Sequence, residues 1–321
     1  MLPFSLMFLN AVASALLTAQ SEGQFPCIFR CAESSAQASE PYVLPDSLFA
    51  AFGGASKVAL GLLSVAYLIA SIGVYLSLIY QISTRTRSAS GAEASARAFG
   101  LPEAVLAGLL TLFLLLTISS AVSQPSVQFN APNLLANFLF TAFVVLIIVT
   151  LLQFRGFAVG ELAGFFKISF VRALGTGGIL LFLAYPLIGL SEAINQRLFG
   201  GGSSKQSIVE FFSGSRTIDE RIMIIVFAVA IAPVFEEFLF RFFIYGVLKR
   251  YFGCLVGVIL SALLFSAAHA HFPSFVPLFV LGGCFAIAYE WSGSILVSMT
   301  MHSLFNSLTL TALAFPELFS Q

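Results

Sequence analysis

Long apolar runs separated by short polar segments dominate the chain. Each run extends over about 20 residues, the length that an α-helix needs to cross a hydrocarbon core of roughly 30 Å. The clearest runs predict eight membrane-spanning helices, near residues 58–80, 104–122, 134–154, 177–193, 222–248, 253–270, 274–291 and 294–314. Residues 2–19 form a further apolar stretch, either a ninth helix or the core of a secretory signal. No basic residue precedes this stretch, which argues against a signal, whereas Ala13-Ser14-Ala15 favours one.

Composition supports a polytopic membrane protein. Hydrophobic residues make up 59% of the 321 residues and charged residues 9%, and the mean hydropathy is +0.98. We therefore predict an all-α bundle of eight or nine transmembrane helices, in contact with membrane lipid. The 15 basic and 15 acidic residues balance, so nothing indicates the electrostatic footprint of a nucleic-acid partner.

Short loops with basic residues alternate along the chain, which orients it; the long loop 192–221 also carries Arg197, Lys205, Arg216 and Arg221, but long loops cross the membrane despite their charge. The basic residues of the short loops follow the first, third and fifth of the eight predicted spans: Arg85, Arg87 and Arg97; Arg155, Lys167 and Arg172; Lys249 and Arg250. The intervening segment 124–133 carries no charge. The positive-inside rule makes the basic loops cytoplasmic.

Polar side chains divide the chain into two parts. The spans within residues 1–176 are almost free of them, so we assign this part as an N-terminal membrane region. From residue 222 onward the spans contain two adjacent glutamates, an arginine, two histidines and an asparagine. Ionisable groups at membrane depth are costly and usually mark a working site, so we expect a catalytic cavity in residues 177–321.

The stretch APVFEEFLFR, residues 232–241, contains the first group. On a helix Glu237 and Arg241 share one face in the favourable order for an ion pair, and Glu236 points about 100° away from them. Pro233 removes a backbone hydrogen bond and should kink the helix near the carboxylates. One carboxylate is thus matched, and Glu236 is left free.

Two later spans supply the remaining groups. FSAAH places Phe265 and His269 one turn apart, and HSLFN does the same for His302 and Asn306. If these faces converge, Glu236 can act as general base on a water, with a histidine to orient it. Asn and His side chains can donate to the oxyanion formed on an amide carbonyl.

A metal ion is the alternative way to activate that water. Glu236, His269 and His302 would suffice as three ligands of a catalytic zinc with an open fourth position. The chain has no H-E-x-x-H helix, however, and spacing alone leaves both routes open.

EEFLFR, FSAAH and HSLFN resemble, in order, the E-E-x-x-x-R, F-x-x-x-H and H-x-x-x-N motifs of the CAAX-protease and bacteriocin-processing (CPBP, abortive-infection) family of intramembrane proteases. The resemblance covers about residues 180 to 314. It implies an endopeptidase that cleaves a peptide or membrane-protein substrate. Relatives in eukaryotes cleave near the C-terminus of isoprenylated proteins, and family members are classed as metalloproteases.

Carried over by motif position, the resemblance makes Glu236 the general base and His269 its partner on the water. His302 and Asn306 would form the oxyanion site, with Glu237 and Arg241 in support. Many relatives have Gly after the motif arginine, where this chain has Phe242, which we expect to narrow the pocket.

Other readings compete with a protease. Polar side chains can hold a helix bundle together without chemistry. The chain would then be a catalytically silent membrane scaffold, such as a bacteriocin-immunity-like protein. A proton-coupled transporter is less favoured, because such proteins often have broken helices in both halves and only one half here has polar spans. We expect a bacterial inner membrane location.

Overall fold

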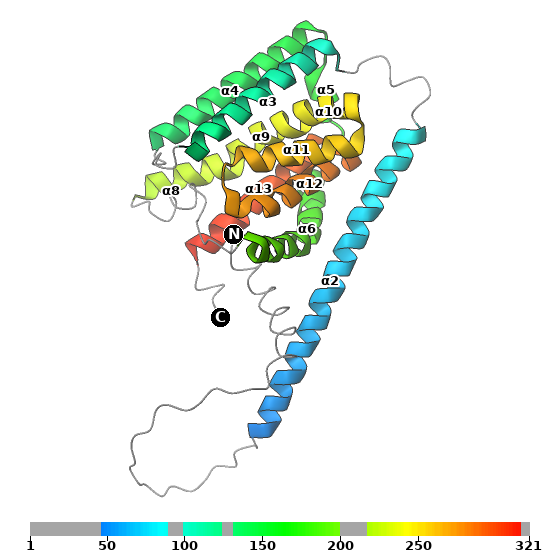
Figure 1. Cartoon of the computed structure of the whole chain (residues 1–321), viewed down its shortest axis with the longest axis vertical. Helices are drawn as coiled ribbons and strands as arrows, with labels where there is room; N and C mark the ends of the chain where they lie inside the picture. The colour runs from blue at the N-terminus through cyan, green and yellow to red at the C-terminus, as the bar shows by residue number, and fades with distance from the viewer. Residues whose placement is uncertain (1–45, 89–98, 124–130, 200–216, 316–321) are drawn as a thin grey trace, which may run out of the picture.

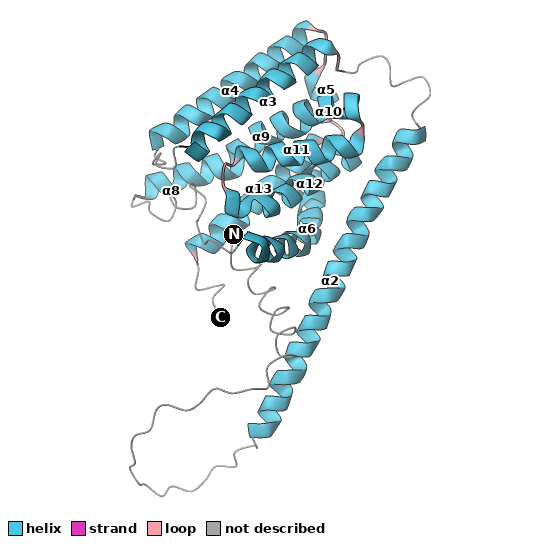
Figure 2. Ribbon diagram, viewed as in Figure 1, coloured by secondary structure: helices cyan, strands magenta, loops and turns pink. Residues whose placement is uncertain are grey.

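The chain folds into α-helices packed side by side (Figures 1 and 2). The computed structural model describes residues 46–88, 99–123, 131–199 and 217–315, and these residues contain no β-strand. The helices are α2 (Asp46–Ser88), α3 (Leu101–Ser123), α4 (Ala131–Phe154), α5 (Val159–Leu162), α6 (Phe170–Phe199), α8 (Ile218–Ile225), α9 (Ala232–Glu237), α10 (Tyr245–Phe252), α11 (Cys254–Ala268), α12 (Phe275–Ser292) and α13 (Ile295–Ala314). Two π-helical turns, η1 (Val226–Ile231) and η2 (Phe238–Ile244), flank α9, and a 3-10 turn, η3 (Phe272–Ser274), precedes α12.

The all-α class is confirmed, and each of the eight predicted spans coincides with helix. Six helical stretches in the described residues are long and apolar enough to cross a membrane: Val58–Arg85, Leu101–Ser120, Asn133–Phe154, Phe170–Arg197, Ile218–Phe252 and Phe272–Ser292. α11 is apolar but shorter, with 15 residues. The protein is thus an integral, multi-pass membrane protein. The apolar stretch 2–19 lies outside the described residues.

The helices of the C-terminal part form the centre of the bundle. α12 packs against α6, α11 and α13, and half of its span (50%) is buried inside the protein. Only 11% of the α3 span and 11% of the α4 span are buried, as expected for helices that face lipid. In Figure 1 these two helices lie together along the face formed by α9, α10 and α11.

α2 leans against this bundle and is tied to α6 by two tyrosines. Pro186 lies inside α6 and has no N–H for the carbonyl of Phe182, four residues earlier. The hydroxyl of Tyr67 on α2 donates to that carbonyl, and Tyr75 donates to the carbonyl of Leu180 at 2.9 Å. A side chain from a neighbouring helix therefore satisfies the carbonyl that the proline leaves unpaired.

The three basic loops meet at one end of the bundle. Arg85, after α2, donates to the carbonyl of Trp291 at the end of α12 (3.1 Å). Beside it, Lys249 of α10 pairs with Glu290 (2.5 Å). The ring of Phe99, just before α3, touches both Phe157 after α4 and Phe243 of η2. The basic loops that alternate along the sequence thus lie at the same end of the bundle. The positive-inside rule predicts that this end is cytoplasmic.

Candidate active site

The two glutamates lie midway along the 35-residue apolar stretch Ile218–Phe252, on the short helix α9 between the π turns. Pro233 accounts for part of this irregularity. The N–H of Ala232 bonds the carbonyl of Phe227 in the π register, and Pro233 has no N–H to offer Ala228. Asn306 fills that position, because its Nδ2 donates to the Ala228 carbonyl at 2.7 Å. π turns are frequent at functional sites. Here η1 also joins α13 to α9, the helix with the two glutamates, through the bond of Asn306 to Ala228.

Glu237 and Arg241 form the predicted ion pair. The Arg241 Nε lies 3.2 Å from Glu237 Oε2, and both side chains are completely buried. The guanidinium also donates to the carbonyl of Gly282 on α12 (3.3 Å). A buried charge needs such partners, since its desolvation costs several kcal/mol.

Aromatic rings from two further helices enclose the guanidinium. Its central carbon lies 4.1 Å from the ring centre of Phe265 on α11 and 5.2 Å from that of Phe285 on α12. The ring faces carry negative partial charge, which favours a cation there. Gly282 makes room for this contact, because a Cβ at that position would come within 3.0 Å of Phe265 and 3.4 Å of Arg241.

His302 on α13 joins the pair to the second carboxylate. Its Nδ1 lies 2.9 Å from Glu237 Oε1, and since a carboxylate accepts, Nδ1 carries the proton. The ring stacks on Phe285, with centroids 4.9 Å apart. Nε2 is then directed to Glu236, at 3.9 Å from Oε2. Glu237 thereby fixes both the tautomer and the orientation of His302.

Glu236 differs from its neighbour in both burial and partners. Its side chain is 29% exposed, against 0% for Glu237. The Oε2 atom is nevertheless buried and has no hydrogen-bond partner among the described residues. At 3.9 Å the separation from His302 is too long for a direct hydrogen bond, and polar atoms so placed are commonly bridged by water.

His269 lies one position beyond the last residue of α11, as its C-terminal cap. Its Nδ1 is 2.8 Å from the carbonyl of Phe265, and because a carbonyl only accepts, Nδ1 carries the proton here too. The imidazole rests edge-on against the Phe265 ring (4.7 Å between centroids). Phe265 also touches the ring of His302 (5.7 Å), so one phenylalanine contacts both histidines and Arg241.

Comparison with known proteins identifies the family of this region. Residues 218–308, which include all three motifs, match the family model described as type II CAAX prenyl endopeptidase, Rce1-like. Residues 218–308 are a domain of the CPBP family, called the CPBP domain below. The membrane-embedded CAAX protease MroQ of Staphylococcus aureus (strain USA300) is 29% identical over 136 residues, which cover 40% of this chain and 53% of the relative. The chain thus spans about half the length of that curated relative, and no solved structure matches it.

Within the CPBP domain the candidate residues form two contact groups around Phe265. Glu236, Glu237, Arg241 and His302 are linked by ion pairs and hydrogen bonds. In the part of the chain that the structure describes, His269 reaches this group through the Phe265 ring and makes no hydrogen bond to Glu236. Asn306 lies one turn from His302, with one of its two amide hydrogens committed to Ala228.

The three side chains considered as zinc ligands do not converge. Over the described ranges, no group of three His, Cys, Asp or Glu side chains could hold a metal ion. Nδ1 of His302 donates to Glu237 and Nδ1 of His269 to a backbone carbonyl, which leaves Nε2 of each ring available. Glu236, His269 and His302 are thus not gathered into a three-ligand group in this arrangement.

Phe242 has a different environment from the one expected. Its ring is buried against Phe238 (4.9 Å) and Phe99 (5.8 Å). No ring contact joins it to the histidines of the CPBP domain in the described residues. Phe242 therefore packs the contact between η2 and the start of α3 and does not narrow the space beside Glu236.

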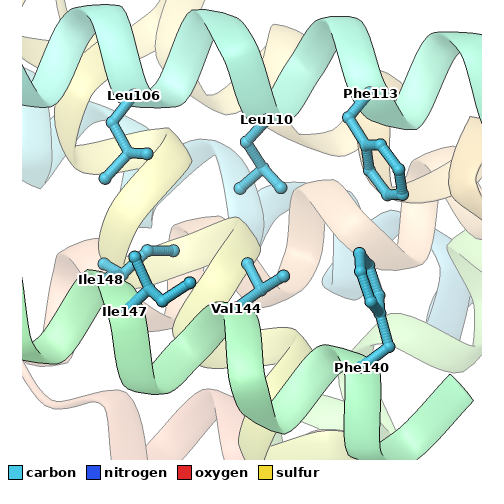
Figure 3. A pocket seen from close by; sticks show the side chains of 7 residues that line it. All are labelled: Leu106, Leu110, Phe113, Phe140, Val144, Ile147 and Ile148. Carbon is cyan, nitrogen blue, oxygen red and sulfur yellow. The ribbon is translucent and has the colours of Figure 1, made fainter. Parts of the chain in front are cut away.

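Sequence reasoning missed the contribution of α12. Phe285 and Gly282 shape the surroundings of Arg241 and His302, yet Phe285 is one of 36 phenylalanines and neither residue has a polar signal. An apolar pocket of about 180 Å³ lies between α3 and α4 (Figure 3). It is lined by Leu106, Leu110, Phe113, Phe140, Val144, Ile147 and Ile148, and contains none of the candidate residues.

Proposed function

We propose that the protein is an intramembrane endopeptidase that hydrolyses a peptide bond with water activated by Glu236. The observation that carries the proposal is the buried Oε2 of Glu236, which lacks a hydrogen-bond partner among the described residues and lies 3.9 Å from His302 Nε2. A water at this position would accept from or donate to polar groups that otherwise stay unsatisfied. The family match and the relative described as a CAAX protease support a peptidase.

In the proposed reaction, Glu236 takes a proton from the water as its oxygen attacks the scissile carbonyl carbon. The tetrahedral intermediate then carries a negative oxygen. Glu236 returns the proton to the departing amine nitrogen, the C–N bond breaks, and the carboxylate is regenerated. His269 orients the water through Nε2, the nitrogen left available by the Nδ1 bond to Phe265.

His302 and Asn306 are proposed to bind the negative oxygen. One turn apart on α13, they can donate from Nε2 and from the second amide hydrogen respectively. His302 would then donate from both ring nitrogens, from Nδ1 to Glu237 and from Nε2 to the negative oxygen. Glu237 and Arg241 act in support, because they fix the direction of the His302 ring.

The charge balance supports Glu236 as the base. Glu237 and Arg241 neutralise each other, so Glu236 is the carboxylate whose charge changes during the reaction. Once Glu236 has taken the proton it is neutral, so the negative oxygen of the intermediate forms with no second unpaired negative charge beside it. In a medium of low dielectric the absence of that repulsion is worth several kcal/mol.

We propose a metal-independent reaction, and so depart from the metallopeptidase class that the resemblance implies. We further propose residues 177–321 as the protease domain, because α6 packs along both α12 and α13. The substrate is a peptide or membrane-protein segment at the membrane, and the location a bacterial inner membrane. Whether the substrate is prenylated is decided by the experiment below.

The experiment is cleavage of quenched fluorescent peptides, prenylated and unprenylated, by purified protein in detergent. Wild type is compared with Glu236→Gln and with Glu290→Gln, which changes a span carboxylate bonded to Tyr245 and Lys249 instead. We expect cleavage by wild type and Glu290→Gln, unaffected by a chelator, and none by Glu236→Gln. Equal cleavage by Glu236→Gln would refute the base assignment, and zinc-restored loss on chelation would refute metal independence. If wild type cleaves no peptide, the scaffold reading is favoured.

A further inference from the structure

A side chain outside the three motifs holds the segment that carries His269. Asn195, near the end of α6, is 3% exposed. Its Nδ2 donates to the carbonyl of Pro273 in η3, at 2.7 Å. Since a carbonyl only accepts, the amide orientation is fixed, with Nδ2 toward Pro273.

The helix that precedes His269 does not determine its position alone. His269 is the C-terminal cap of α11, and Ala270 follows with φ of 46°, in the left-handed region that a residue with a Cβ rarely adopts. Residues 269–275 therefore need tertiary contacts to hold their course. Ser266 donates to the carbonyl of Phe275 (2.5 Å), which joins α11 to the start of α12. Asn195 adds a contact from a different helix.

Pro277 explains why the Pro273 carbonyl needs a side-chain donor. In helical geometry this carbonyl would pair with the N–H of residue 277, and a proline has none. The same solution occurs twice elsewhere, where Tyr67 serves Phe182 in α6 and Asn306 serves Ala228 in η1. Asn195 is the instance that acts on the segment bearing His269.

A second observation separates Asn195 from an ordinary structural bond. Its Oδ1 is buried with no hydrogen-bond partner among the described residues. An apolar side chain would avoid that unsatisfied atom but would leave the Pro273 carbonyl without its donor, so the amide is present for the Nδ2 bond to this segment.

We propose that Asn195 is a positioning residue: by donating to the Pro273 carbonyl it fixes residues 269–275 and hence the direction of the His269 imidazole. This inference rests on the proposed function, in which His269 orients the attacking water. A displacement of about 1 Å at a reacting group can lower a rate on the order of 10²-fold, so the expected effect is on kcat.

The test uses the full chain with a rescue variant. Asn195→Ala should lower kcat on the order of 10²-fold with KM within about twofold. Pro277→Ala supplies the missing backbone N–H, so the double variant Asn195→Ala/Pro277→Ala should regain most of kcat. Tyr67→Phe removes the equivalent donor at Phe182 and should leave kcat unchanged. Unchanged kcat in Asn195→Ala, or a loss that Pro277→Ala does not restore, would overturn the proposal.

Hydrogen–deuterium exchange of residues 269–276 in the same variants gives a readout that does not depend on activity. Exchange should accelerate in Asn195→Ala and return toward wild type in the double variant. If wild type cleaves no peptide, the proposed function fails, while this exchange pattern still decides whether Asn195 holds the segment. Exchange that is the same in wild type and Asn195→Ala would overturn that role.

Discussion

Removing both members of the buried ion pair should cost much less than the sum of the two single removals. At the observed 3.2 Å and an effective dielectric constant near 20, the attraction between Glu237 and Arg241 is about 5 kcal/mol. Breaking such a pair leaves one uncompensated charge and typically costs about 3–5 kcal/mol. We expect Glu237→Gln and Arg241→Met each to lower the free energy of unfolding by that amount. The double variant should lose much less than the sum, with a coupling of about 3 kcal/mol.

Thermal unfolding in one fixed detergent, followed by the fluorescence of the single tryptophan Trp291, measures these differences. At roughly 2 °C per kcal/mol, each single variant should lower Tm by about 6 °C or more. Glu192→Gln serves as the control, because Glu192 accepts an exposed hydrogen bond from Gln196 (3.1 Å) and surface substitutions usually change the free energy of unfolding by less than about 0.5 kcal/mol. Additive effects of Glu237→Gln and Arg241→Met would refute the reasoning.

Three further outcomes follow from the same contacts. Glu236→Gln should lower kcat by about 10²–10⁴-fold with an unchanged Tm, measured by peptide cleavage and thermal unfolding, because only the reacting carboxylate is lost. Gly282→Ala should destabilise the protein by about 1–3 kcal/mol in the same unfolding assay, since its Cβ would crowd Phe265 at 3.0 Å. Asn306→Ala should lower both Tm and kcat, and adding Pro233→Ala, which returns an N–H for the Ala228 carbonyl, should restore Tm alone.

Hydropathy predicted the helices well because membrane spans need only length and apolar character, not a partner. α11 shows the limit of the length argument: at 15 residues it is shorter than the other spans, and it packs between the buried η2 and α12. The ion pair of Glu237 with Arg241 could also be predicted from the sequence, since both residues lie on one helix four positions apart.

Contacts between different helices could not be predicted from the sequence in this way. His302 hydrogen bonds Glu237, whereas motif position assigns His302 to the oxyanion site together with Asn306. Which carboxylate a ring reaches depends on helix rotation, and two π turns beside α9 alter that rotation. Pro233 predicted an irregular helix but not the two π turns. The sequence around Asn195 did not indicate its role, because that role depends on Pro277 in a different helix.

The contrast between two adjacent glutamates links the fold to the proposed chemistry. Neighbouring helical residues point about 100° apart, so one can face the interior and the other its edge. Glu237 faces the interior, where Arg241 balances its charge between two aromatic rings. The Arg241 ion pair thus matches the charge of Glu237 inside the bundle, whereas the Glu236 side chain lies at the edge and is 29% exposed. In the proposed reaction Glu236 is the carboxylate that takes the proton from water, and Glu237 holds the His302 ring beside it.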